Sequence, residues 1–186
     1  MIGAERDIFR LIPTAFLEYP GSVSLQAETF KNVVKDICRS MNGYGVRKFY
    51  VLNTGISTLR PLSAVAQELA ADGIILHYLN LLEVDKTLPE GLLKQEGGTH
   101  ADESETSMML YIAPEAVDMT RAVKDYDPRP GRRGLTRNAQ GQGTYSPTGV
   151  WGDGTLATRE KGRIIVERTV QAIVQQVRDL IALKLD

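Results

Sequence analysis

The chain has 186 residues, and its 22 basic and 23 acidic side chains leave a net charge of −1, so no overall field attracts nucleic acid or an anionic membrane. Its one cysteine excludes an internal disulfide, no apolar run approaches the about 20 residues of a membrane span, and Glu5 and Asp7 make the N-terminus unlike a signal peptide. We therefore expect a cytoplasmic protein, most simply one domain, with no nucleic-acid or membrane partner.

The first clear element after the irregular residues 1–20 is an amphipathic helix over Gln26 to Met41. Its apolar residues recur at helical spacing, at Ala27, Phe30, Val33, Val34, Ile37, Cys38 and Met41. Asn42 and Gly43 are expected to end it. Because Cys38 belongs to the apolar stripe, a buried structural thiol is favoured over a nucleophile.

A βαβ unit follows. Lys48 to Asn53 has the continuous β-forming composition of a strand covered on both faces, Leu59 to Ala71 has a helical pattern, and Ile74 to Leu82 forms a second strand containing His77. That histidine is interpreted as a core residue rather than a ligand. Since functional groups gather at the carboxyl ends of parallel strands, the turn from Asn53 to Ser57 is expected beside the site described next.

The densest polar cluster begins at Gly97 with GGTHADESETS. Asp102 followed three residues later by Glu105 predicts a helix start near Asp102 to Glu103, and Pro114 predicts its end. Capping alone explains the acidic residues. It does not explain the two glycines before His100, which allow close backbone approach, and a histidine beside a carboxylate can move protons or bind a metal. Both readings stay open on this pattern alone.

Residues 125 to 154 show no clear element, and such a long segment is usually functional or disordered. It ends in a glycine-rich stretch around Trp151, after which residues from Thr158 to Leu185 form a long amphipathic helix that should cover one face of the sheet.

Four segments together resemble the creatininase family (creatinine amidohydrolase-like proteins) in order and spacing: EYPGSVSLQAET, RKFYVLNTG, HADESETSMMLYIAPEAVDM and GVWGDGTLATREKG. The resemblance implies an α/β three-layer sandwich with a mostly parallel sheet flanked by helices, formed by a single domain over residues 1–186. It also implies metal-dependent hydrolysis of a non-peptide C–N amide bond in a small molecule, and assembly as a homo-oligomer, usually a hexamer.

The resemblance implies roles for two residues, His100 as the acid/base and Glu105, in the E-T-S motif, as a metal ligand. The family's N-G-H-x-E-N turn has Gly55 and Ser57 at its histidine and glutamate positions in this chain. The family's N-terminal E-x-H segment is not matched, because the chain begins too late for it. Further candidate ligands or site residues are Asp102, Glu103, Asn53, Glu5 and Asp7.

Two hypotheses follow. The chain is a metal-dependent amidohydrolase, using Zn²⁺ or Mn²⁺ with weak affinity, or it is a non-catalytic relative that keeps the fold and the oligomer surfaces and binds no metal. No organic cofactor site is expected. A shortened sheet should also leave an open strand edge, and the segment 125–154, with Tyr145 and Trp151, is expected to pack on a neighbouring subunit.

Overall fold

The computed structural model of the chain describes residues 18–127, 135–141 and 143–185. The chain divides into two compact units. Among the described residues, the first unit contains 24–84 and 171–185, and the second contains 18–23 and 85–170 apart from its undescribed positions. The single-domain expectation stays a prediction.

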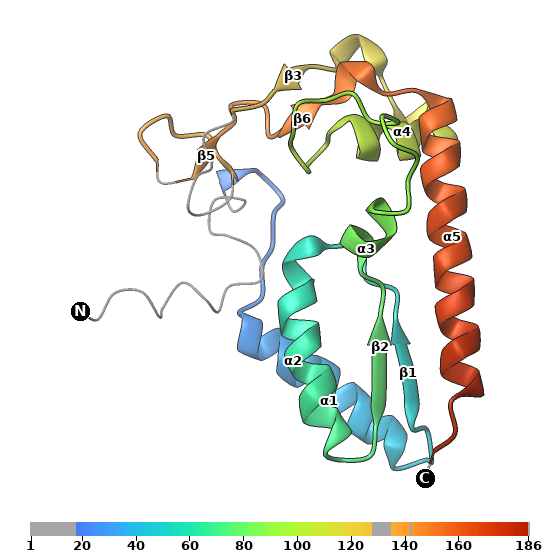
Figure 1. The fold of residues 1–186 in the computed structure, drawn as a ribbon. Helices are drawn as coiled ribbons and strands as arrows, with labels where there is room; N and C mark the ends of the chain where they lie inside the picture. The colour runs from blue at the N-terminus through green and yellow to red at the C-terminus, as the bar shows by residue number, and fades with distance from the viewer. Residues whose placement is uncertain (1–17, 128–134, 142, 186) are drawn as a thin grey trace. The chain divides into compact units, whose positions relative to one another are not determined.

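The first unit contains the predicted βαβ arrangement (Figure 1). Strands β1 (Lys48–Val51) and β2 (Ile75–Tyr78) pair in parallel, with Lys48 opposite Ile75 and Val51 opposite Tyr78. Its helical elements are α1 (Ala27–Asn42), η3 (Ile56–Thr58), α2 (Leu59–Ala70) and α3 (Leu81–Asp85).

One boundary in this unit was predicted wrongly. The second strand was expected to run to Leu82, but it ends at Tyr78, and α3 begins at Leu81. Asn80 turns the chain, because its side-chain Oδ1 accepts the backbone N–H of Leu82 at 3.1 Å and its carbonyl accepts that of Val84 at 3.3 Å. The apolar run Leu79 to Leu82 does not distinguish a strand from a helix start.

The sheet of the first unit is covered on both faces, which gives it three layers (Figure 1). On one face, Phe49 and Leu76 pack with side chains of α1 and α2 in an apolar cluster that includes Cys38 and Leu69. On the other face, the Tyr50 hydroxyl donates to Gln176 of α5 at 2.7 Å. Burial raises the pKa of Cys38, as expected for a structural thiol.

The second unit is built around α4 (Glu103–Ile112), which ends one residue before the Ala113–Pro114 step as predicted. Among the described residues that follow, the 3-10 turns are η4 (Pro114–Ala116), η5 (Met119–Arg121) and η6 (Gly154–Leu156). The segment that lacked a pattern contains short strands: β3 (Lys124–Asp125) pairs antiparallel with β6 (Gly152–Asp153), and β4 (Leu135–Thr136) pairs in parallel with β5 (Thr144–Tyr145).

Helix α5 (Arg159–Ala182) contributes its first turns to the second unit and its remainder to the first. A Cβ on Gly162 would collide with the backbone carbonyl of Ser107 on α4, so only glycine allows the two helices to approach so closely. The Ser107 hydroxyl accepts the backbone N–H of Thr158 at 3.1 Å. Within the described ranges, no helix combines the length and apolar character needed to cross a bilayer. The α/β class predicted from the sequence is confirmed.

Candidate functional site

His100 lies where two chain segments of the second unit cross. Its backbone forms an isolated antiparallel bridge with Trp151: the Trp151 N–H donates to the His100 carbonyl at 2.8 Å, and the His100 N–H donates to the Trp151 carbonyl at 3.2 Å. That carbonyl also accepts the N–H of Thr99 at 2.9 Å. These backbone hydrogen bonds therefore fix the position of His100 in the second unit.

Two glycines make this crossing possible. A Cβ on Gly98, whose φ is +107°, would collide with the Trp151 carbonyl, and one on Gly152, whose φ is +150°, would collide with Asp102. Both glycines are needed for space and for backbone conformation. The GGTH and WGDG stretches of the sequence are therefore two halves of one crossing.

Between His100 and the helix, Ala101 has a φ of +49°, a left-handed conformation that non-glycine residues rarely adopt. Two carboxylates hold it. Asp102 is the N-cap of α4 and its Oδ1 accepts the Glu105 N–H at 2.9 Å, while Glu105 Oε2 accepts the Ala101 N–H at 2.6 Å. The predicted capping pair is confirmed, and it brings Glu105 to the residue that follows His100.

The side chain of Gln95 joins the separate parts of this segment. Its Oε1 accepts the backbone N–H groups of Glu103 at 3.0 Å and Asp153 at 3.2 Å. Its Nε2 donates to Asp102 Oδ2 at 2.7 Å and to the Gly98 carbonyl at 3.3 Å. One amide therefore contacts both ends of the His100 loop and the strand that crosses it.

Glu103, a candidate ligand, is fully buried in an ion pair. Its Oε1 bonds the Lys161 ammonium, and its Oε2 accepts the backbone N–H groups of Lys94 and Gln95, both at 2.7 Å. Lys161 also donates to the Leu156 carbonyl at 2.8 Å. Both carboxylate oxygens of Glu103 are therefore occupied by contacts that stabilise the fold.

One further carboxyl group, that of Asp85, interacts electrostatically with Asp102 at the start of α4. Crowding by protein atoms raises the pKa of Asp85, although part of the residue remains open to solvent, and the negative charge of Asp102 raises it further. Glu105 itself is exposed. Its carboxylate can therefore reach solvent or a bound molecule.

Asn53 lies in the first unit and organises the turn after β1. Its Nδ2 donates to the carbonyls of Gly55 at 2.9 Å and Leu79 at 3.2 Å, and its Oδ1 accepts the Thr58 hydroxyl. These bonds stabilise the turn that has Gly55 and Ser57 at the two expected ligand positions. That this turn and the His100 helix share one cleft stays a prediction.

The described residues do not assemble a metal centre. Among them, no three His, Cys, Asp or Glu side chains are grouped closely enough to hold an ion. Glu5 and Asp7 lie outside the described residues. Divalent ions that activate water need several N or O donors at fixed geometry, so the donor set in this part of the chain does not fit one.

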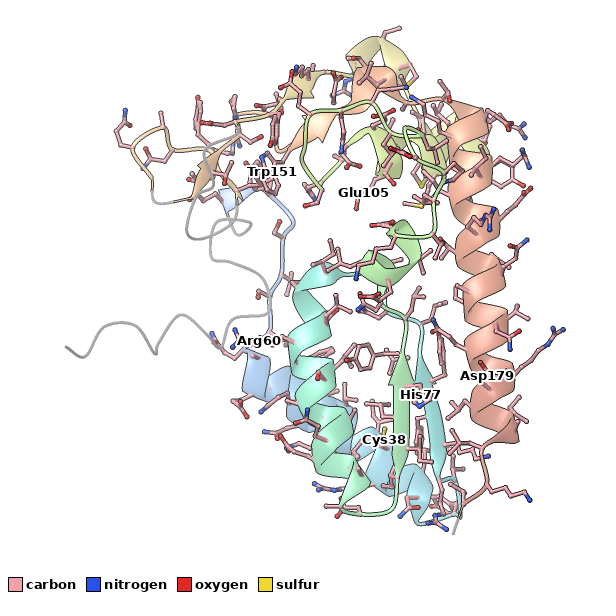
Figure 2. The ribbon with its side chains drawn as sticks, in the orientation of Figure 1. Cys38, Arg60, His77, Glu105, Trp151 and Asp179 are labelled. Atoms are coloured by element: carbon pink, nitrogen blue, oxygen red, sulfur yellow. The ribbon has the colours of Figure 1, made fainter. Side chains whose placement is uncertain are left out.

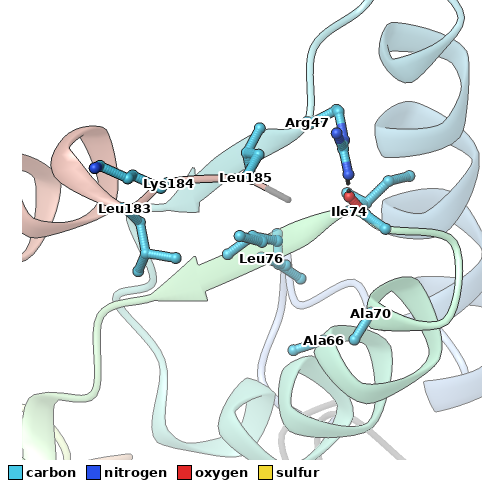
Figure 3. A pocket seen from close by; sticks show the side chains of 10 residues that line it. Arg47, Ala66, Ala70, Ile74, Leu76, Leu183, Lys184 and Leu185 are labelled. Atoms are coloured by element: carbon cyan, nitrogen blue, oxygen red, sulfur yellow. Dashed lines mark hydrogen bonds between the residues drawn. The ribbon is translucent and has the colours of Figure 1, made fainter.

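Each of the two units contains a surface cavity. One of about 380 Å³ lies in the first unit, between the starts of the strands and the C-terminal residues (Figure 3), and none of the candidate residues lines it. Another, of about 200 Å³ in the second unit, is lined by Ala101 and Thr106 beside the His100 loop, with Asp118 and Arg121 among its other residues. The second cavity is the better candidate for a binding site, because it adjoins the strained Ala101.

Three side chains important to this region were missed from the sequence. Gln95 lies outside the quoted motifs, Lys161 was given no role within its motif, and each bonds a partner 58 residues away along the chain. Trp151 was predicted to lie in a family-like motif and in an interface, but not to bridge His100 through its backbone, and its ring lies 6.1 Å from that of Tyr126. Figure 2 labels Glu105 and Trp151 within the second unit. The paired glycines were the signal that could have located the crossing.

Comparisons with known proteins agree on one relationship. The family model described as "Creatininase: Creatinine amidohydrolase" matches residues 12–177. A creatinine amidohydrolase from Pseudomonas putida is 28% identical over 175 residues, which are 87% of this chain and 66% of that protein.

Solved structures give the same result. A creatininase mutant complexed with creatine superposes with a TM-score of 0.65 at 25% identity, over 90% of this chain and 72% of the other. A structure named creatininase Mn gives 0.63 at 25% identity, over 87% and 67%.

Proposed function

The chain belongs to the creatininase family, and on that premise we propose that it hydrolyses the C–N amide bond of a small non-peptide molecule with a divalent metal ion. One observation carries this proposal: the matched range 12–177 contains His100 and Glu105 on either side of the strained Ala101, at the mouth of one helix. Backbone strain of this kind clusters at functional sites.

In this proposal His100 moves protons. Amide hydrolysis requires a base that takes a proton from water and an acid that gives one to the departing nitrogen, and an imidazole performs both steps near neutral pH. Glu105 is the proposed metal ligand. Its Oε2 accepts the Ala101 N–H, and an ionised carboxylate has further lone pairs with which to bind a cation.

The proposal assigns no metal ligand other than Glu105. Because the described donors do not fit a metal centre, we expect affinity well below that of an intact dinuclear site. Isothermal titration with Mn²⁺ and Zn²⁺ measures this. Tight stoichiometric binding of two ions per chain would contradict it and would assign ligands among residues outside the described ranges, such as Glu5 and Asp7.

Activity is tested on chain purified in Mn²⁺ or Zn²⁺, with creatinine and creatine as probes. If the proposal holds, His100→Gln lowers the rate by about 10²–10⁴-fold and Glu105→Gln lowers both metal content and rate. The matched control is His77→Gln, since His77 lies within β2 and has no proposed role. Equal rates for the wild type and His100→Gln would refute the assignment.

A second candidate function is favoured by the lack of a ligand cluster among the described residues and by Gly55 and Ser57 in the turn after β1. In this alternative the chain is a non-catalytic relative that keeps the fold. Folded protein with neither bound metal nor turnover supports it, whereas turnover that depends on His100 excludes it.

We also propose that the chain forms a homo-oligomer in which the segment 125–154 contacts a neighbouring subunit. Tyr145 is 40% exposed, so its ring is available to a neighbouring subunit, whereas the Trp151 ring already packs near Tyr126. Light scattering gives the mass in solution. A monomer refutes the proposal, and an oligomer weakened by Tyr145→Ala supports it.

A further inference from the structure

The hydrogen bonds of Gln95 form a set that neither the sequence motifs nor the family relationship assigns. Its side-chain oxygen accepts two backbone N–H groups, and its side-chain nitrogen donates twice. A primary amide has two donors and two acceptor lone pairs. All four are therefore used, by the Gly98 loop, the first residues of α4 with its N-cap, and β6.

These four bonds lie around His100 in a specific way. Gly98 and Asp102, which accept from Nε2, are the residues two before and two after His100. Asp153, which donates to Oε1, is two residues after Trp151, the bridge partner of His100. The amide thus closes the loop across its base and attaches it to the crossing strand.

Close packing at Gly152 and backbone strain at Ala101 both require that the loop be held in place. A Cβ on Gly152 would also meet the Gln95 Oε1, so the backbone is pressed against the amide. Ala101 has a left-handed backbone that persists only when its surroundings hold it. Asp102, which caps the helix and orients Glu105, receives one of the Gln95 bonds on its second carboxylate oxygen.

We propose that Gln95 is the positioning residue of this site: its side-chain amide holds the loop Gly98–Asp102, and with it His100 and Glu105, in place against Asp153. The inference rests on the proposed roles of His100 and Glu105. It makes a separate structural statement, that the donor half of one amide fixes the loop from which His100 projects.

Gln95→Glu isolates that donor half. The introduced carboxylate keeps an oxygen for the N–H groups of Glu103 and Asp153, but it replaces the donor to Asp102 with an acceptor that repels it. The matched control is Gln140→Glu, which makes the same charge change at an exposed position of the same unit.

The readout is the NMR signal of the His100 ring at constant pH, because a change in overall stability alone leaves the signal of the folded state unmoved. The chain has two histidines, so His77 is an internal reference. We expect the His100 ring signals to shift or broaden in Gln95→Glu while those of His77 remain, and both to remain in Gln140→Glu. Unchanged His100 signals in folded Gln95→Glu overturn the proposal.

A measurement on the unaltered chain keeps the test valid if Gln95→Glu fails to fold. The amide hydrogens of Glu103 and Asp153, which bond Oε1, should exchange together and slowly, opening as one unit. Rapid exchange at Asp153 alone overturns the proposal. In Gln95→Glu that folds, loss of two bonds should speed exchange at Ala101 by roughly ten-fold.

Kinetics separate this inference from the proposed function. If the wild type hydrolyses a probe amide, Gln95→Glu should lower kcat more than it changes KM, because the acid/base group is displaced. If the wild type shows no turnover, the proposed function fails, while the ring signals and exchange rates still decide whether Gln95 holds the loop.

Discussion

In the first unit the buried side chains are mainly apolar, and in the second they are mainly polar groups that hydrogen-bond to neighbouring side chains and backbone groups. The apolar set of the first unit includes Leu62, Val65, Leu69 and Ile74, each with no exposed area. The second unit buries Asp102, Glu103, Ser107, Thr136, Thr144, Ser146 and Asp153. Every buried side-chain nitrogen or oxygen among the described residues has a hydrogen-bond partner.

The difference indicates which unit can carry chemistry. Apolar burial stabilises a unit without specifying directions, since it scales with the area removed from water. Buried polar groups must be matched in position and direction, and an unmatched one is costly. A unit built that way holds polar side chains such as those of Asp102 and Gln95 in set orientations, which a catalytic or binding loop requires.

The largest expected effect is the loss of the buried ion pair in the second unit. Lys161→Met leaves the fully buried Glu103 carboxylate without its cation, which should lower the free energy of unfolding by about 3–5 kcal/mol. Urea unfolding measures it. Arg163→Met, which breaks exposed pairs on the same helix, is the control, expected below about 1 kcal/mol. Equal losses in both variants would mean that Glu103 finds another partner.

The second-largest expected effect comes from creating a cavity in the apolar core of the first unit. Leu69→Ala removes a side chain with no exposed area from the apolar cluster, and the expected loss is about 2–5 kcal/mol. Val33→Ala, at an exposed position on α1, provides the comparison and should change stability little. Thermal unfolding followed by circular dichroism distinguishes them, and a small effect of Leu69→Ala would show that the cluster collapses around the gap.

A smaller effect distinguishes a strained loop from a helix. Ala101→Gly relieves a left-handed backbone, which costs an alanine about 1–2 kcal/mol, and this offsets the entropy that glycine adds to the unfolded chain. We expect stability unchanged or slightly raised. Ala66→Gly, inside α2, should instead lose about 1 kcal/mol. Equal losses at the two positions would contradict the strain at Ala101.

The smallest effect is a pH dependence on the surface of the first unit. Hydrogen bonding and charge attraction from Lys35, and charge attraction from Lys31, lower the pKa of Glu68. A lowered carboxyl pKa contributes stability above the unfolded-state pKa, and that contribution disappears as the pH falls through the folded-state pKa. Because Glu68 is 41% exposed, we expect a few tenths of a kcal/mol. The difference between wild type and Glu68→Gln should be full at pH 7 and vanish in acid.

Local chemistry explains which features could be read from the sequence. The helix over Gln26 to Met41 appears as α1, and the capping pair Asp102 and Glu105 starts α4, because helical periodicity and caps depend on residues three or four apart. The βαβ order followed from alternating strand and helix patterns. The end of β2 was misplaced, since Leu79 to Leu82 has the composition of either element.

The site itself was decided by contacts that no short pattern contains. His100 was recognisable from its neighbours, but its crossing with Trp151, the clamp of Gln95 and the burial of Glu103 against Lys161 join residues 51 to 58 positions apart. The sequence by itself determined the fold class, the N-terminal cap of α4 and the family. Only the tertiary structure decided which carboxylates stabilise the fold and which remains exposed, because a side chain's role depends on the groups that packing brings to it.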